Sequence, residues 1–472
     1  MPGTDQLQKV VLSFGGGWAT DFGPSFIAAA QGNNLTVPYF MRADNITYEL
    51  DGSPHKIGGS QVLNANATAG AIAGLYDFWL QGTAGTETQK RVIFEGTRIA
   101  KDDVDGVWDT LTSAQEDAKE PSFETFDALC IMATDSTVDV PRSWDGTAAS
   151  TSALAGSPPN FAFSRAHKNR LWAAGNAALP SRLYYSESLN PEIWTGGGSG
   201  SIDIDPDDGD RITGLVSHRN ELIVFKGPNR LSIHRITGSA PTGTDAFARV
   251  PFVVGVGSFN HNSIFRINDD IVFASPRGLH SLAATAAYGD YVEAFLSRPI
   301  LQFYQDELNH NVLTRMWGVN YQAKGLAIWN APRSGGTVYN NYLVYDYRFQ
   351  PGRWASWGVN STYVNPNCLA IVQIPSTRRH RLFCGTTAGY VHELDRAVRS
   401  TGVVGSGAGT AYTGDVLTPF LNFGTSAIGK NAHRGFWSLL PKGAFNFTFS
   451  YTRDNLAAQE VTIPQGGGDT LA

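Results

Sequence analysis

Lys168-Asn-Arg-Leu171-Trp172-Ala-Ala-Gly175 is the stretch that decides the fold, because related stretches return at regular intervals along the chain. A typical copy begins with a polar or charged group, continues through four or five apolar residues and passes through a glycine-bearing turn to a second apolar strand. The copies that follow are Arg219-Asn-Glu-Leu222-Ile-Val-Phe225-Lys-Gly227, Asn268-Asp-Asp-Ile271-Val-Phe273, Gly325-Leu326-Ala-Ile-Trp329 and Arg381-Leu382-Phe-Cys384-Gly385.

The spacing of these copies predicts a β-propeller. Leu171, Leu222, Ile271, Leu326 and Leu382 are separated by 51, 49, 55 and 56 residues. Repeats of roughly 40–50 residues with strands inside each unit are typical of propeller blades. Two weaker units lie upstream, at residues 91–96 and 128–132, so we expect six to eight blades, with seven as the best value.

Aromatic residues at the ends of these units support the same interpretation. They are Trp108, Trp144, Trp194, Trp354 and Trp357. A bulky ring at the end of a unit can pack between neighbouring sheets. We therefore expect these tryptophans to fill the spaces between blades.

Composition places the chain among all-β proteins. Its 472 residues are 42% hydrophobic and contain 51 Gly and 23 Pro, while only 17% are charged. The net charge of −6 excludes a general basic field that would attract nucleic acid. The three cysteines, Cys130, Cys368 and Cys384, are an odd and sparse set for a secreted disulfide scaffold. Cys130 and Cys384 each lie in an apolar strand run, so we expect them to be small core residues.

The chain divides into four parts by composition and residue pattern. Residues 1–44 predict an N-terminal arm, 45–400 the propeller, 401–415 a Ser/Gly/Thr-rich linker, and 416–472 a small C-terminal β domain without an obvious closing strand. Within the last part, residues 445–451 alternate aromatic and small or polar residues, which predicts a half-buried strand. Residues 297–308 predict a short amphipathic helix with Ile300, Phe303, Tyr304 and Leu308 on its apolar face.

Targeting signals are not recognised. Gly15-Gly-Gly17, Asp21 and Pro24 interrupt the apolar stretch near the start, which argues against a signal peptide. No run of eighteen apolar residues occurs, so no membrane span is expected. We expect synthesis and folding in a cytoplasm.

No enzyme signature is present in the sequence, and we expect no catalytic residues, cofactor or metal. The strongest metal candidate is Asp203-Ile-Asp205-Pro-Asp207-Asp208-Gly209-Asp210, because alternate carboxylates can wrap a hard cation. However, a helix-loop calcium site needs Gly where Asp208 stands and Glu where Gly214 stands. We interpret the run as a solvated turn that enters the strand at residues 211–216.

Three further groups of residues were weighed as sites. Residues 184–194, from Tyr184 to Trp194, are similar to the aspartate box of sialidase-like propellers but lack its Asp and Gly, so they predict a blade-closing turn. Glu192, Asp290 and Asp346 could supply paired carboxylates for glycoside hydrolysis. Arg378-Arg379-His380-Arg381 is the densest basic cluster, and it predicts a solvated turn before a strand.

A wider resemblance rests on the order of several motifs. The motifs are Asn45-x-x-Tyr48 with Asp51-Gly52 and Lys56-Ile-Gly-Gly59, Asn169-Arg170-Leu-Trp, Asp210-Arg-Ile-Thr-Gly-Leu with Glu221-Leu-Ile-Val-Phe, Ser297-x-x-Ile300, Tyr342-Leu-Val-Tyr345-Asp346 with Trp354 or Trp357, Arg381-Leu-Phe-Cys384-Gly385, and Gly389-Tyr-Val-His-Glu-Leu394-Asp395. In this order, across roughly residues 45–452, the chain resembles the tail nozzle proteins of short-tailed bacteriophages, also called tail hub or tail tubular protein B.

The resemblance implies a non-enzymatic virion protein. It implies a homohexameric ring below the portal and adaptor that serves as a conduit for DNA ejection and retention, without sequence-specific contact with DNA. The other tail proteins would be its partners, and the host bacterial cytoplasm its place of synthesis. The C-terminal part ends early compared with that family.

The alternative from a different class is a carbohydrate-binding or glycan-degrading propeller. Such a protein should expose aromatic residues beside carboxylates in a loop. The tryptophans of this sequence mostly lie inside apolar strands or at the ends of units, so we expect the tail role.

Overall fold

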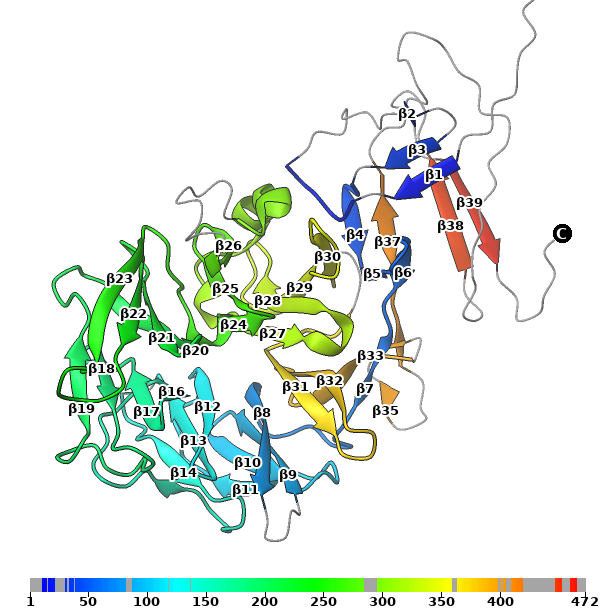
Figure 1. The fold of residues 1–472 in the computed structure, drawn as a ribbon. Coiled ribbons are helices and arrows are strands. Elements are labelled where there is room, and N and C mark those ends of the chain that lie inside the picture. The colour runs from blue at the N-terminus through cyan, green and yellow to red at the C-terminus, as the bar shows by residue number, and fades with distance from the viewer. Residues whose placement is uncertain are drawn as a thin grey trace, which may run out of the picture. The chain divides into compact units, whose positions relative to one another are not determined.

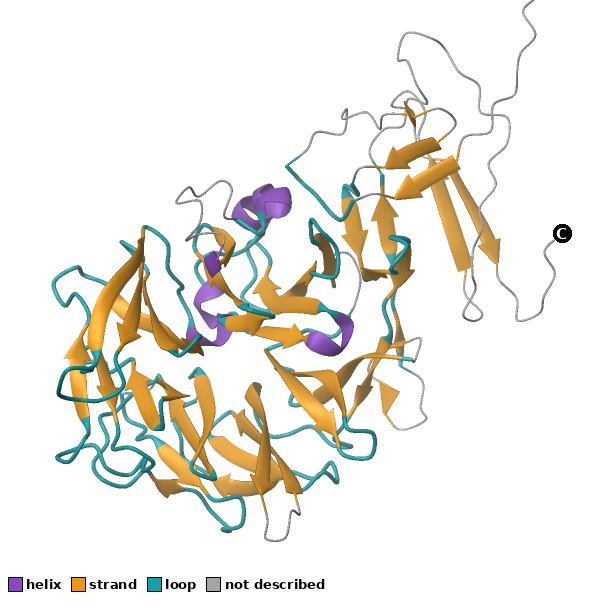
Figure 2. Cartoon of the chain, viewed as in Figure 1, coloured by secondary structure: helices purple, strands orange, loops and turns teal. Residues whose placement is uncertain are grey.

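The computed structural model describes most of the chain. The described residues are 11–14, 16–21, 30–31, 34–37, 39–81, 87–117, 119–135, 137–283, 295–358, 363–397, 400–401, 403–404, 409–418, 446–451 and 459–464. The chain separates into two compact units, Met1–Phe423 and Gly424–Ala472. The larger unit is an all-β structure in which short helical turns join sheets (Figures 1 and 2).

The described part of the larger unit contains a seven-bladed β-propeller. Blades 1 to 4 are four-stranded sheets of consecutive strands, and their innermost strands β8, β12, β16 and β20 contact one another around the ring (Figure 1). Blade 1 is β8 (Ile72–Gln81), β9 (Glu87–Glu95), β10 (Arg98–Asp102) and β11 (Asp109–Thr112); blade 2 is β12 (Pro121–Phe126), β13 (Leu129–Thr134), β14 (Arg142–Trp144) and β15 (Ser152–Ala153); blade 3 is β16 (Phe163–His167), β17 (Arg170–Ala174), β18 (Arg182–Tyr185) and β19 (Gly200–Asp203); blade 4 is β20 (Arg211–His218), β21 (Glu221–Gly227), β22 (Ser232–Thr237) and β23 (Ala248–Val254).

Blades 5 to 7 complete the ring. Blade 5 has three described strands, and blade 7 takes its fourth strand from the N-terminal region. Blade 5 is β24 (Phe265–Ile267), β25 (Asp270–Ser275) and β26 (Gly278–Ser281); blade 6 is β27 (Gly318–Tyr321), β28 (Leu326–Pro332), β29 (Tyr339–Asp346) and β30 (Arg353–Trp357); blade 7 is β31 (Cys368–Ile374), β32 (Arg379–Gly385), β33 (Val391–Arg396) and β7 (Gly59–Val62). The predicted propeller of about seven blades is confirmed.

The recurring polar group of the repeat forms the turn between the first two strands of a blade. Lys168 and Asn169 have φ values of 48° and 57°, and Arg219 and Asn220 have 46° and 63°. Two successive left-handed residues make the type I′ turn whose twist matches that of paired strands. This turn explains why a polar pair precedes each apolar run: the pair makes the hairpin and the run becomes the second strand.

The apolar runs form the cores between neighbouring sheets. The five residues that define the repeat period, Leu171, Leu222, Ile271, Leu326 and Leu382, lie on the second strands of blades 3 to 7 and are at most 1% exposed. Separate apolar clusters lie between blades 1 and 2, 2 and 3, 3 and 4, and 4 and 5, and the largest joins blades 5, 6, 7 and 1. Of the predicted inter-blade tryptophans, Trp144, Trp194, Trp354 and Trp357 are buried there, whereas Trp108 is half-buried. Cys130, Cys368 and Cys384 are buried free thiols, and the predicted burial of Cys130 and Cys384 is confirmed.

The ring closes through a strand from far away in the sequence. β7 pairs antiparallel with β33, so the N-terminal segment supplies the outer strand of blade 7 before the chain enters β8 of blade 1. β4 (Arg42–Asp44) extends blade 6 beside β30. In the sequence, the hairpin of β5 (Ile46–Tyr48) and β6 (Pro54–Lys56) lies between β4 and β7. Closure therefore joins residues about three hundred positions apart, as in the pairing of Val62 with His392.

The segment predicted as a linker contains strands that belong to the propeller sheets. β35 (Val403–Val404) pairs with β7, and β37 (Asp415–Leu417) pairs with β4. β34 (Ser400–Thr401) and β36 (Thr410–Ala411) pair with each other. Short strands with free edges on blades 6 and 7 recruit these residues, and the division between the compact units falls at Phe423 rather than near residue 415.

Helical turns occupy the connections around blades 5 and 6 (Figure 2). They are η2 (His261–Ser263), η3 (Arg298–Ile300), η4 (Phe303–Glu307), η5 (Leu313–Arg315) and η6 (Gln322–Lys324). The predicted helix at 297–308 corresponds to η3 followed by the π-helical turn η4. All four residues of its predicted apolar face are buried.

The remaining strands lie near the two ends of the sequence. Within the predicted arm, β1 (Val11–Phe14), β3 (Asn34–Val37) and β2 (Ala30–Gln31) form a three-stranded sheet. In the smaller unit, β38 (Asn446–Tyr451) pairs antiparallel with β39 (Gln459–Pro464). The strand predicted at 445–451 is therefore present. The structure does not describe the side chains of its aromatic residues, so their predicted burial stays a prediction.

Candidate functional site

The acidic run at 203–210 surrounds a lysine. The loop leads from β19 into β20, as the sequence predicted, but Lys226 of β21 places its Nζ atom among the oxygen atoms of the loop. The ammonium donates to both carboxylate oxygens of Asp208, at 2.7 and 2.8 Å, and to the carbonyl oxygens of Ile204 and Asp205, at 2.6 and 2.8 Å. A positive side chain thus occupies the position in which we had weighed a divalent cation.

The other carboxylates of the run are also used within the fold. Asp210 is buried and accepts backbone N–H bonds from Asn229, Arg230 and Leu231, each at 2.8 Å. Asp203 forms a bidentate ion pair with Arg182, and the hydrogen bonds from Arg182 lower the pKa of the Asp203 carboxyl. The loop is therefore a joint between blades 3 and 4, and Asp208 and Asp210 are not the solvated residues that we expected.

The carboxylates weighed for glycoside hydrolysis are not brought together. Glu192 is exposed on a loop of blade 3, whereas Asp346 is buried on β29 of blade 6 and binds Arg348 through both oxygens at 2.9 and 2.6 Å. Asp290 lies outside the described residues. These residues therefore give no paired-carboxylate site in the described structure.

Two other predicted segments are turns at the edges of blades. In the segment 184–194, Trp194 is buried against Phe161, with ring centroids 5.6 Å apart. In the basic cluster, Arg378 is exposed, pairs with Glu87 at 2.7 Å and lies over the Trp79 ring. The segment 184–194 is placed as the sequence predicted, whereas only Arg378 of the basic cluster lies in the turn, because β32 already begins at Arg379.

Residues of the resembling motifs meet where the N-terminal segment joins blades 6 and 7. The Tyr48 hydroxyl donates to the carbonyl oxygen of Trp354 at 2.7 Å, and the side-chain oxygen of Asn45 accepts from the Gly358 N–H at 2.8 Å. The carboxylate of Asp395 accepts from the Gly58 N–H at 2.8 Å. We call this region, defined by Asn45, Tyr48, Gly58, Trp354 and Asp395, the closure seam.

Contacts also cross the centre of the propeller at one end. The side-chain amide of Asn262, in the turn that leads into blade 5, donates to the carbonyl oxygen of Pro121 in blade 2 at 3.0 Å. Arg315, just before blade 6, forms an ion pair with Glu120, just before blade 2. Blades 2 and 5 are three blades apart, the largest separation in a ring of seven. The centre of this ring is therefore bridged by protein.

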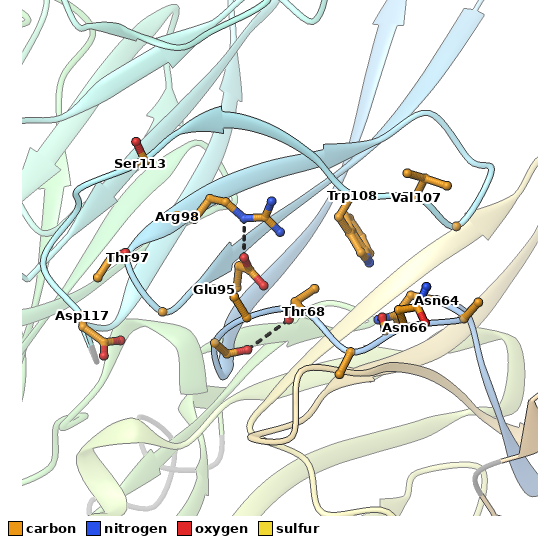
Figure 3. A pocket seen from close by; sticks show the side chains of 16 residues that line it. Asn64, Asn66, Thr68, Glu95, Thr97, Arg98, Val107, Trp108, Ser113 and Asp117 are labelled. Carbon is orange, nitrogen blue, oxygen red and sulfur yellow. Dashed lines mark hydrogen bonds and ion pairs between the residues drawn. The ribbon is translucent and has the colours of Figure 1, made fainter.

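An open pocket of about 680 Å³ lies between blade 1 and the chain segment that enters it from blade 7. One wall is the segment 64–70, and the other comes from the turns of blade 1, where Glu95, Arg98 and Trp108 face the hollow (Figure 3). Gly70 lets the two walls approach, because an added Cβ atom would lie 2.7 Å from the Cα atom of Gly96. The sequence predicts Trp108 in an inter-blade core and does not mark Glu95 as a site residue. Its only available signal was a tryptophan near acidic residues in a turn.

In the part of the chain that the structure describes, no three His, Cys, Asp or Glu side chains are grouped so that they could hold a metal ion. None of the helices among the described residues has the length and apolar character of a membrane span.

Comparison with known proteins gives similarity to solved structures alone. No protein-family model matches the chain, and no curated protein matches it. Two structures of the extracellular domain of BT4673 from B. thetaiotaomicron, described as a one-component and as a hybrid two-component system, match at 13% and 12% identity with TM-scores of 0.41 and 0.42. Each match covers 72% of this chain and 40% of the other, so the chain spans less than half of those structures.

A third similar structure is XC5397 from Xanthomonas campestris, a gluconolactonase. The match covers 75% of this chain and 94% of that chain, at 13% identity and a TM-score of 0.35. Similarities at this level carry no argument about activity, and neither BT4673 nor XC5397 is described as a phage tail protein.

Proposed function

We propose that this chain is a structural protein of the tail of a short-tailed bacteriophage. In this role, copies of the chain form a ring below the portal and adaptor, with six copies as the resemblance implies. The ring retains the packaged DNA and conducts it during ejection. The support is the resemblance in motif order together with what the motif residues do in the fold.

The observation that carries the proposal is the closure seam. The polar groups of the motif residues form hydrogen bonds within the closure seam: Tyr48 with Trp354, Asn45 with Gly358, and Asp395 with Gly58. Catalytic groups are held in an accessible site. Residues that fasten a distant segment into a ring instead favour a role in which the propeller supports further parts of an assembly.

Under this proposal, DNA would pass outside the bridged centre of the propeller. Asn262 and Pro121 are hydrogen-bonded across the propeller, and Arg315 and Glu120 form an ion pair there. A duplex cannot occupy the same space as these contacts. In the proposed ring the conduit is therefore the space enclosed by several copies, and rotational symmetry closes it. The net charge of −6 suits a wall past which DNA slides, because few phosphates would be neutralised.

The experiment is to determine the copy number of the chain in purified native particles by electron cryomicroscopy. We expect six copies around the tail axis, next to the portal–adaptor assembly. The isolated chain can remain monomeric until that template is present, so a monomer in solution does not bear on the result. A particle that carries the chain in a single copy, or lacks it, would refute the proposal.

A carbohydrate-binding or glycan-degrading propeller is the second candidate function. The specific observation in its favour is the pocket of blade 1, in which a half-buried indole lies among polar side chains. Sugar-binding sites commonly combine an aromatic face with hydrogen-bonding groups. Glycan degradation would additionally need a pair of catalytic carboxylates, for which the described residues offer no assembled geometry.

A further inference from the structure

The blade 1 pocket contains polar atoms that the fold leaves without partners. Among the described residues, Oε2 of Glu95 and Nε1 of Trp108 are buried atoms that make no hydrogen bond. Polar atoms in such positions are nearly always paired in proteins, with protein groups or with a bound molecule. Figure 3 shows the Glu95 carboxylate and the Trp108 indole facing the same hollow from two sides.

The unpaired acceptor is held rigidly. Glu95 ends β9 and is only 2% exposed. Its other oxygen accepts a hydrogen bond from Nε of Arg98, and Arg98 in turn donates to the Thr110 hydroxyl at 2.8 Å. The guanidinium therefore orients the carboxylate and balances its charge, while Oε2 has no hydrogen-bond partner among the described residues.

The opposite wall is fixed by blade 7. The backbone N–H of Thr68 donates to the carbonyl oxygen of Gly389 at 2.8 Å, and the side-chain oxygen of Asn64 accepts from the Val391 N–H at 2.9 Å. The pocket is thus preformed between two blades. Binding in a preformed pocket avoids the entropic cost of ordering loops.

We infer that this pocket binds a neutral carbohydrate. A pyranose ring offers C–H groups to an aromatic face, and each hydroxyl can both donate to Glu95 and accept from the Trp108 N–H. Glu95 and Arg98 neutralise each other, and the carboxylate of Asp117 adds a negative charge to the lining, so the pocket does not favour an anionic ligand. The volume of about 680 Å³ lies in the range of ligand pockets and admits more than one sugar unit. The inference does not depend on the tail role, and it gives the second candidate function a defined site.

Saturation-transfer NMR tests this inference with four neutral probes: glucose, galactose, N-acetylglucosamine and L-rhamnose. The full-length chain should transfer saturation to at least one of them. Trp108→Phe keeps a ring but removes the N–H donor, and we expect binding to weaken by about three- to tenfold. Trp108→Ala also removes the aromatic face and should abolish detectable binding. The matched control is Trp79→Phe, since Trp79 is another half-buried tryptophan of blade 1 that does not line the pocket.

The outcomes separate clearly. Weaker binding to Trp108→Phe than to the wild type, with unchanged binding to Trp79→Phe, supports the site. The inference is overturned if no neutral probe binds the wild-type chain, or if both Phe variants bind equally well. Preferential binding of N-acetylneuraminic acid over all four probes would overturn the assignment of a neutral ligand. Circular dichroism of each variant shows whether it is folded, and Glu95→Gln, which keeps the shape of the side chain, repeats the test if Trp108→Ala does not fold.

Discussion

Lys226 and Asp208 form an ion pair in which Nζ lies 2.7 Å from Oδ1 and 2.8 Å from Oδ2 of the carboxylate. The lysine side chain is fully buried on blade 4, while Asp208 belongs to the loop that arrives from blade 3. The ammonium is also bonded to two backbone carbonyls of this loop. One side chain therefore holds the connection between two blades in place.

Replacing this lysine should destabilise the propeller. Lys226→Met keeps much of the side-chain volume but leaves the Asp208 carboxylate and the loop carbonyls without their donor. Removing one partner of a buried pair costs about 3–5 kcal/mol, and the partial exposure of Asp208 places the expected loss near the lower end. The free energy of unfolding in urea measures it.

A surface pair provides the control for this measurement. Arg219 pairs with Asp269, and both side chains are mostly exposed. Arg219→Met should leave the urea midpoint unchanged within error, because exposed ion pairs contribute little to stability. If Lys226→Met behaved like Arg219→Met, the buried pair would not be a joint between the blades.

The same geometry predicts that the acidic loop is indifferent to divalent cations. The Lys226 ammonium already neutralises the loop at its centre, so calcium would have to displace it. Thermal unfolding curves recorded with calcium and with a chelator should superimpose. A ligand that binds only the folded state raises its stability. A rise of several degrees with calcium would therefore reveal a metal site that the lysine does not fill.

Acid should destabilise the chain through buried histidines. Burial lowers the pKa of His280 to about 3, against about 6.5 for an exposed histidine. Between these values the unfolded chain binds a proton that the folded chain does not, so stability is full above about pH 6.5 and is lost as the pH falls toward 3. Neither ring nitrogen of His280 has a hydrogen-bond partner among the residues that the structure describes, and its ring stacks on Phe273.

His280→Phe should remove this part of the pH dependence. The stability gained over the wild type should grow by about 1 kcal/mol for each pH unit below about 6.5. Urea unfolding at a series of pH values measures the difference. His380→Phe, at an exposed position near the start of β32, is the control and should follow the wild-type curve. Parallel curves for His280→Phe and the wild type would contradict the assigned role of His280.

Local pattern predicted the blades well, and long-range pairing explains what it missed. The period from Leu171 to Leu382 located five second strands, because a polar turn followed by an apolar run encodes a hairpin within a few residues. β7 was missed because Gly59–Val62 is short and weakly apolar, and it becomes a strand only beside β33. No local pattern relates Lys226 to Asp208, since the two residues lie on different blades.

The candidate pocket was missed for a related reason. Trp108 was expected to fill a space between blades, as Trp144 and Trp194 do. Trp108 does pack against the core shared by blades 5, 6, 7 and 1, but it is half-buried and also lines the pocket beside the segment 64–70, which blade 7 holds through Gly389 and Val391. A sequence pattern reports which side chains are apolar, but not which of them a distant segment leaves open to solvent.

Two truncations test where the propeller ends. The chain ending at residue 423 keeps β35, β37 and Tyr412, so its urea midpoint should match that of the full-length protein.

Ending the chain at residue 400 removes Tyr412, which is buried. The Tyr412 hydroxyl donates to the carbonyl oxygen of Ile57 at 2.5 Å, and its ring packs on Tyr363 with ring centroids 5.2 Å apart. Loss of a buried aromatic side chain costs about 3–5 kcal/mol, and the edges of β4 and β7 would also lose their partners. We expect the shorter chain to unfold at lower urea and to be cut first in the N-terminal segment during limited proteolysis. Equal stability of the two truncated chains would show that residues 401–423 are a linker after all, as their composition alone suggests.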